Sequence, residues 1–274
     1  MIRQQILILL LCILPSGLLP AQTSDSLRTR LSATKDPSSK ADLLIQLSNS
    51  YRYSSPDSSA IYARQASALL SSLKDSVRLV DADIFICYYY YNTGRADSGL
   101  LLSQHYINWL QQQPALLGKL ANFYSISGLC LMKLDKKKEA LDRFYKALNY
   151  AEKADDHLTR LKAYVNIGWA MMELNQFEEA IQNFHLAIDL IQIRKLPETF
   201  LAVTYSNMAS SFGSLNHLDS ASKYSQLAIN TARKSGDITT EANSLFILGS
   251  TQVRKGQLNE ALNSYLKAQP LREK

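Results

Sequence analysis

The sequence predicts an all-α, right-handed superhelical solenoid of about six helical hairpins. Small residues recur at intervals of 39, 41, 40, 41 and 40, at Ser48, Cys87, Gly128, Gly168, Ala209 and Gly249. A second small residue follows each of them by 12 positions, at Ala60, Gly99, Ala140, Ala180, Ala221 and Ala261. A fixed period near 40 residues is typical of stacked supersecondary units that bury their apolar faces against one another.

Each unit is predicted to hold two helices, which we call helix A and helix B. Between residues 161 and 193, apolar residues recur at helical spacing on both sides of Asn175 and Gln176. The position of Asn175 is taken in other units by residue types that tolerate a left-handed backbone and so end a helix: Gly94, Asp135, Asn216 and Gly256. Helix A is therefore expected to end there, and helix B to begin almost at once.

Local signals add detail to this pattern. Gly168 on helix A and Ala180 on helix B would let the two backbones approach closely, while Tyr164 and Phe184 fill the space around the crossing. Asp156 and Thr239 are predicted N-caps for the helices A that follow them.

These positions resemble the tetratricopeptide repeat motif. The best matches are Tyr164-Ile167-Gly168-Met171-Ala180-Phe184-Ala187, Tyr124-Ser127-Gly128-Leu131-Ala140-Phe144-Ala147 and Leu245-Leu248-Gly249-Gln252-Ala261-Tyr265-Ala268. The two units before residue 120 match weakly. The resemblance implies a non-enzymatic module that binds a protein or peptide in the concave groove lined by its A helices.

The expected organisation has three parts. Residues 1–21 have the basic start, apolar run and small residue before a cleavage site, Ala21, of a signal peptide. A lipoprotein signal at Cys12 is the weaker alternative. Residues 22–40 are expected to form a capping or flexible lead-in, and residues 41–274 the solenoid, with units starting near 41, 80, 121, 161, 202 and 242. The mature protein would be exported and soluble, with no membrane span.

Composition and motifs argue against several classes of function. The net charge of +6 is mild, and the lysines are scattered except at 136–138, so no nucleic-acid partner is expected. The chain has no phosphate-binding glycine loop, and its four histidines lack metal-ligand spacing. We therefore expect no catalytic residues, no cofactor and no metal. Cys87 and Cys130 are expected to be buried thiols, with a disulfide as the alternative.

The candidate binding residues lie on the A helices at positions that packing within a unit does not require. They are Tyr88, Tyr91, Leu129, Met132, Asn166, Trp169, Met172 and Asn207. Aromatic residues and methionine suit a binding surface, although tight winding could bury part of this stripe as core. Asn166 and Asn207 resemble asparagines that hold ligand backbone in kinesin light chain; the alternative is a bond to a neighbouring helix. Lys133 and Lys162 lie nearby without the paired Lys/Asn pattern of a carboxylate clamp.

Two other functions remain open. Exported arrays with this spacing and a Ser-Pro-Asp-Ser start at residues 55–58 resemble the sensor regions of Bacteroidetes-type two-component and transcriptional regulators. The chain would then be a sensor without its membrane and output domains. It could instead be a scaffold in an envelope complex. Leu262 and Leu266 on the last helix B have no following unit to cover them, which suggests self-association through the C-terminal unit.

Overall fold

The computed structural model describes residues 19–272, and these residues form the predicted all-α solenoid. The predicted signal peptide lies outside the described residues up to residue 18. The A helices are α2 (Pro37–Tyr51), α4 (Ser76–Asn92), α6 (Leu120–Lys133), α8 (His157–Glu173), α10 (Thr199–Ser214) and α12 (Ile238–Arg254). The B helices are α3 (Pro56–Ser72), α5 (Ala96–Leu110), α7 (Lys137–Lys153), α9 (Phe177–Arg194), α11 (Leu218–Ser235) and α13 (Leu258–Arg272).

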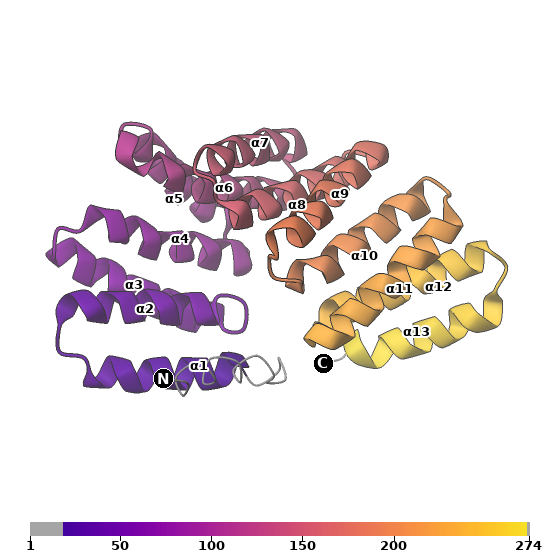
Figure 1. Cartoon of the computed structure of the whole chain (residues 1–274), viewed down its shortest axis with the longest axis horizontal. Coiled ribbons are helices and arrows are strands. Elements are labelled where there is room, and N and C mark those ends of the chain that lie inside the picture. The colour runs from indigo at the N-terminus through magenta and orange to yellow at the C-terminus, as the bar shows by residue number, and fades with distance from the viewer. Residues whose placement is uncertain (1–18, 273–274) are drawn as a thin grey trace, which may run out of the picture.

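The six hairpins follow one another round an arc (Figure 1). The arc runs from α1 at the lower left, over α5 to α9 at the top, to α13 at the lower right. Each helix B packs on the helix A of its own hairpin and on the next helix A. Each helix A also contacts the next helix A along the chain. Stacking therefore continues without a break through all six hairpins, as expected of a solenoid.

The turns between helices A and B have the predicted backbone. In five hairpins the second residue after helix A has a left-handed conformation: Gly94 (φ 75°), Asp135 (φ 58°), Asn175 (φ 60°), Asn216 (φ 61°) and Gly256 (φ 76°). The first hairpin differs, because none of residues 52–55 has a positive φ. Its helix A ends at Tyr51, three residues after Ser48, whereas α8 continues to Glu173, five residues after Gly168.

The predicted close crossing of helices A and B is confirmed at Gly168. A Cβ atom on this glycine would lie 2.5 Å from Cε1 of Phe184 on α9. The same geometry recurs one unit earlier, where Gly128 faces Phe144 at 2.5 Å. The aromatic ring thus occupies the volume that the glycine leaves empty, and both phenylalanines are fully buried.

Three local expectations can be compared with the structure. Of the two alternatives for the lead-in, residues 22–33 agree with the capping one, because they belong to α1 (Leu19–Ala33), which packs on α2 through the buried Leu27. The predicted N-cap Asp156 is confirmed, since its carboxylate accepts the N–H of Thr159 at 3.0 Å. The N-cap predicted at Thr239 was wrong: Asp237 caps α12 instead.

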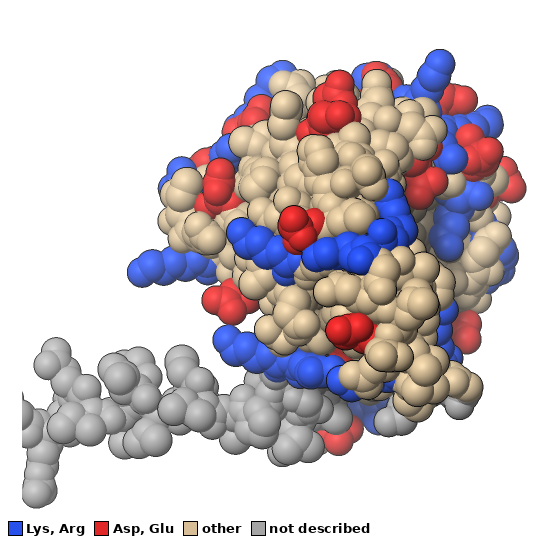
Figure 2. Space-filling model, turned by 90° about the vertical axis from the view of Figure 1, so that its right-hand side faces the viewer, with Lys and Arg blue, Asp and Glu red and all other residues tan. Residues whose placement is uncertain are grey.

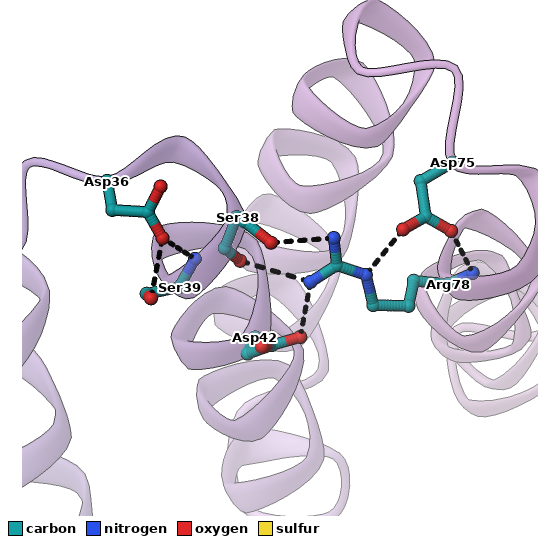
Figure 3. Close-up of polar contacts among 6 residues, drawn as sticks. All are labelled: Asp36, Ser38, Ser39, Asp42, Asp75 and Arg78. Atoms are coloured by element: carbon teal, nitrogen blue, oxygen red, sulfur yellow. Dashed lines mark hydrogen bonds and ion pairs between the residues drawn. The ribbon is translucent and has the colours of Figure 1, made fainter.

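The first two A helices are joined by one arginine (Figure 3). The Arg78 guanidinium donates from Nε to Asp75 Oδ2 at 2.7 Å, on its own helix start. It also reaches α2, where Nη2 donates to Ser38 Oγ at 2.8 Å and Nη1 to Asp42 Oδ1 at 3.0 Å. The N-terminal ends of α2 and α4 are thereby held together.

Three further observations concern the cysteines, membrane-spanning helices and metal-binding groups. Cys87 and Cys130 are both buried as free thiols. Among residues 19–272, no helix combines the length and the apolar character that crossing a bilayer requires. No group of three potential metal-binding side chains occurs in that same part of the chain.

Candidate binding groove

A pocket of about 100 Å³ opens on the surface formed by the A helices. Its lining comes from five hairpins: Tyr53 after α2, Tyr88 on α4, Ser125 and Leu129 on α6, Lys162, Val165 and Asn166 on α8, and Phe200 on α10. Residues nearly 150 positions apart, Tyr53 and Phe200, therefore line one small space. The curvature of the array brings them together, because hairpins in a solenoid otherwise contact only their neighbours.

The structure divides the predicted binding residues into two groups. Tyr88, Leu129 and Asn166 line the pocket. The other five do not: Tyr91, Met132, Trp169, Met172 and Asn207.

The burial of the predicted residues shows that the stripe is partly core and partly surface. Tyr88 is 8% exposed and Met132 is 9% exposed, so these two side chains are buried. Trp169 and Met172 are half-buried and pack against the core cluster that contains Met132. Some of the predicted residues therefore belong to the core, and others remain partly exposed on the surface. The half-buried side chains are the ones that a ligand could still contact.

The two asparagines differ in their surroundings. Asn166 lies at the pocket, and its Nδ2 donates to Ser125 Oγ on the preceding helix A at 3.4 Å. Asn207 is half-buried on α10, away from the pocket lining. A long bond to a hydroxyl leaves the Asn166 amide with further hydrogen-bonding capacity, since an amide has two donor hydrogens and an acceptor oxygen.

Sequence reasoning missed the lining residues Tyr53 and Phe200 and the neighbouring Arg52. The Arg52 guanidinium carbon lies 4.5 Å from the ring centroid of Tyr53 and 4.7 Å from that of Tyr88, within cation–π range of both. Tyr53 is 74% exposed at the rim. A signal was present in the sequence, because Arg52 follows Ser48 by four positions, just as Tyr91 follows Cys87 and Met172 follows Gly168.

Lys162 adds a second cation to the site. Burial lowers the pKa of Lys162, the positive charge of Arg52 lowers it further, and Asp156 partly opposes the shift. Burial also raises the pKa of the Tyr88 hydroxyl to about 12, so Tyr88 is neutral at physiological pH. The pocket therefore combines aromatic walls with the cationic Lys162, and Arg52 stacks on two of its tyrosines. None of its lining residues carries a negative charge.

Sequence comparison agrees with this architecture. A tetratricopeptide repeat family model matches residues 119–192, and a second one matches residues 242–274. The chain contains tetratricopeptide repeats. The two matches fall on the third, fourth and sixth hairpins, which carry the best motif positions.

Known proteins with similar repeats differ widely in length and setting. The chain is 25% identical over 147 residues to human (Homo sapiens) outer dynein arm-docking complex subunit 4, covering 54% of this chain and 21% of the relative. It therefore spans about a fifth of the length of that curated relative. The mouse (Mus musculus) subunit is 24% identical over 181 residues, or 64% of this chain and 28% of the relative.

Solved structures share the fold of these repeats at low sequence identity. Cut9 with Hcn1, from the APC/C hetero-tetramer, superimposes with a TM-score of 0.70 at 15% identity, over 92% of this chain and 45% of that one. A Rap protein complexed with Competence and Sporulation Factor gives a TM-score of 0.64 at 12% identity, over 93% and 86% of the two chains. The array of tetratricopeptide repeats indicates a module for protein–protein interaction.

Proposed function

We propose that the chain is an exported, non-enzymatic module that binds an extended peptide or protein segment along the surface of its A helices. The observation that carries this proposal is the pocket shared by five hairpins, with an exposed tyrosine at its rim. Half-buried aromatic and methionine side chains continue from it on α4 and α8. Such side chains supply contact area with adaptable packing, as binding hot spots do.

An extended ligand suits the dimensions of the array. Neighbouring helices pack about 8–10 Å apart, and an extended chain rises about 3.3 Å per residue. About three ligand residues would then pass each A helix. The Rap structure was solved in complex with Competence and Sporulation Factor, which supports ligand binding by a chain of this shape.

The test compares the chain's two tryptophans. Trp169 is half-buried on helix A of the fourth hairpin, and Trp109 is half-buried on helix B of the second. The full chain is screened on an array of capped random nonapeptides, and the affinity of the strongest binder is measured for both variants. Trp169→Ala should weaken binding by about 2 kcal/mol, whereas Trp109→Ala should leave it unchanged.

The outcomes separate binding from folding. Thermal unfolding of both variants is followed alongside binding. Equal loss of affinity in the two variants, or an array without any binder, would contradict the groove. Unfolding of Trp169→Ala with full stability of Trp109→Ala would place Trp169 in the core and remove it from the binding surface.

Export rests on the first 21 residues, whose composition is that of a signal peptide. N-terminal sequencing of the protein from an envelope fraction should begin at Gln22. Recovery of the chain in the cytoplasm with Met1 still present would refute export.

The C-terminal unit is a second contact surface in the proposal. Leu258, Leu262 and Leu266 on α13 are 66%, 58% and 59% exposed and, at intervals of four, lie on one helix face. Figure 2 views the C-terminal side, where uncharged residues make up most of the surface between separate charged side chains. Self-association through α13 predicts concentration-dependent dimers in sedimentation that Leu262→Glu abolishes. Purely monomeric sedimentation of the unmodified chain at high concentration would refute it.

A further inference from the structure

We propose that the pocket lined by Lys162, with Arg52 stacked on two of its tyrosines, binds the side-chain carboxylate of an acidic ligand residue and thereby fixes the register of the peptide in the groove. This inference rests on the proposed peptide-binding function. It adds a chemical requirement: a Glu or Asp within the ligand, opposite the first and fourth hairpins.

Arg52 is held in place by its surroundings. Its guanidinium stacks on Tyr53 and Tyr88, and its backbone oxygen accepts the Asn92 Nδ2 at 3.0 Å. The Nε–H is buried and makes no hydrogen bond. A buried donor without a partner is costly, so this atom favours an incoming acceptor.

Lys162 lacks a compensating anion of its own. Within residues 19–272, no ion pair joins Arg52 or Lys162 to a carboxylate. The nearby Asp156 is engaged elsewhere, since its oxygens accept from the N–H of Thr159 at 3.0 Å and from the Thr159 hydroxyl at 2.6 Å. Lys162 is a partly desolvated cation in the pocket lining, and the positive charge of Arg52 disfavours its protonated form. A bound carboxylate would offset that repulsion.

The lining of the pocket suits an acidic side chain. Leu129 and Val165 line it together with Lys162, so a carboxylate on one or two methylene groups can approach the Lys162 ammonium while its methylene groups contact apolar side chains. Tyr53 and Phe200 line the same pocket and add aromatic surface for those methylene groups.

The experiment uses peptides of known sequence and the full chain. The nonapeptide array is repeated with every position scanned, using N-acetylated peptides, each in a C-terminally amidated form and in a form with a free C-terminus. We expect one position to require Glu or Asp. Replacing that residue by Gln or Asn in the strongest binder should weaken binding about 30-fold, the equivalent of losing about 2 kcal/mol from one buried charge pair.

Three variants assign the effect to the pocket. Lys162→Met and Arg52→Met should each abolish the preference for the acid over its amide while apolar preferences at other positions persist. Lys133→Met is the matched control, because Lys133 lies on an A helix, 5.5 Å from the ring centroid of Tyr91, but is exposed, and neither Lys133 nor Tyr91 lines the pocket. Lys133→Met should retain the preference.

Each result decides a different question. Peptide binding with no acidic preference, or a preference that survives both pocket variants, would overturn the carboxylate site and leave the groove intact. Binding that requires a free C-terminus instead of an internal acid would also overturn it. An array without binders would overturn the proposed function itself, and the carboxylate site with it.

Discussion

Gly168 shows how one missing side chain sets the distance between two helices. The ring of Phe184 occupies the space where a Cβ would stand, and the pair recurs at Gly128 and Phe144. Sequence alone predicted this crossing, because the period places a glycine and an aromatic residue 16 positions apart in both units. Packing in such a site leaves no room for even one methyl group.

Gly168→Ala is expected to destabilise the chain by about 1–3 kcal/mol through overpacking, measured by thermal or denaturant unfolding. Gln176→Ser, in the exposed turn, should change stability by less than about 0.5 kcal/mol. Adding Phe184→Leu to Gly168→Ala should restore part of the loss, since the two residues share one volume. Equal shifts for Gly168→Ala and Gln176→Ser would refute the assigned contact.

Lys162→Met is expected to stabilise the folded chain at pH 7 by about 0.5–2 kcal/mol, because a poorly solvated charge is removed. The lowered pKa gives this gain a pH dependence. Between the lowered pKa of the folded chain and the ordinary 10.5, the unfolded chain binds more protons, so wild-type stability rises with pH. The gain from Lys162→Met should therefore shrink as pH rises toward 10.5. A variant less stable than wild type at pH 7 would show that Lys162 supports the fold.

The binding site was only partly predictable at this scale. Lys162 was recognised near the groove, but Arg52 was not predicted to lie near it. Arg52 is 110 positions earlier in the sequence, and only the curvature of the whole array brings it near. Periodicity shows which residues share a face, but it does not give the angle through which each hairpin turns.

At the scale of helices, four of the six A helices begin with an aspartate N-cap, and the sequence analysis missed most of these caps. Asp36, Asp75, Asp156 and Asp237 each accept the backbone N–H three residues later. They are 39, 81 and 81 positions apart, which is one, two and two periods. Such caps satisfy donors that the helix itself cannot. Only Asp156 was predicted, because the period had been counted from the middles of the helices.

The lead-in helix α1 was missed for a related reason. Residues 22–40 contain few apolar side chains, so no helical periodicity stands out. The helix buries Leu27, 7% exposed, against α2, together with Ser24 and the half-buried Leu31. A helix that covers only one side of an array needs little apolar surface, and sequence patterns detect such elements poorly.

Arg78→Met should loosen α1 to α3 from the rest of the array, because Arg78 bridges the starts of α2 and α4. Hydrogen exchange should show lower protection in residues 19–72 and unchanged protection beyond α6. Lys146→Met, which removes an exposed pair with Asp142 inside α7, is the control and should leave both regions unchanged. Uniform loss of protection along the chain after Arg78→Met would contradict a local link.

The pKa values of Asp36 and Asp75 add an acid dependence at this end. Hydrogen bonds from Ser39 lower the pKa of Asp36, and hydrogen bonds from Arg78 lower that of Asp75. Their contribution is thus present above the ordinary value of 3.8 and is lost as pH falls below it through the lowered values.

At the scale of the whole molecule, the core is uneven. The largest fully buried side chains all lie between Leu47 and Phe184. The last two hairpins share a smaller cluster built around Ile229, Leu245 and Ala268. Stability in a solenoid is a sum over hairpins and their interfaces, so it follows this distribution.

We expect hydrogen exchange to be fastest in the C-terminal hairpin. Amides of α12 and α13 should be protected about tenfold less than those of α6 to α9, a difference of about 1.4 kcal/mol in local opening. The middle hairpins provide the internal reference in the same experiment. Protection that is equal along the chain would mean that the array unfolds as one unit.

The width of the pocket depends on the curvature of the solenoid. Tyr53 and Phe200 belong to the first and fifth hairpins, so a small change of angle at every joint between them adds up across the opening. A ligand that contacts both Tyr53 and Phe200 would link the first and fifth hairpins directly. Such a ligand would make the solenoid more resistant to stretching without contacting the interfaces between hairpins. A force that pulls the two ends of the chain apart would separate the two sides of the pocket and weaken ligand binding.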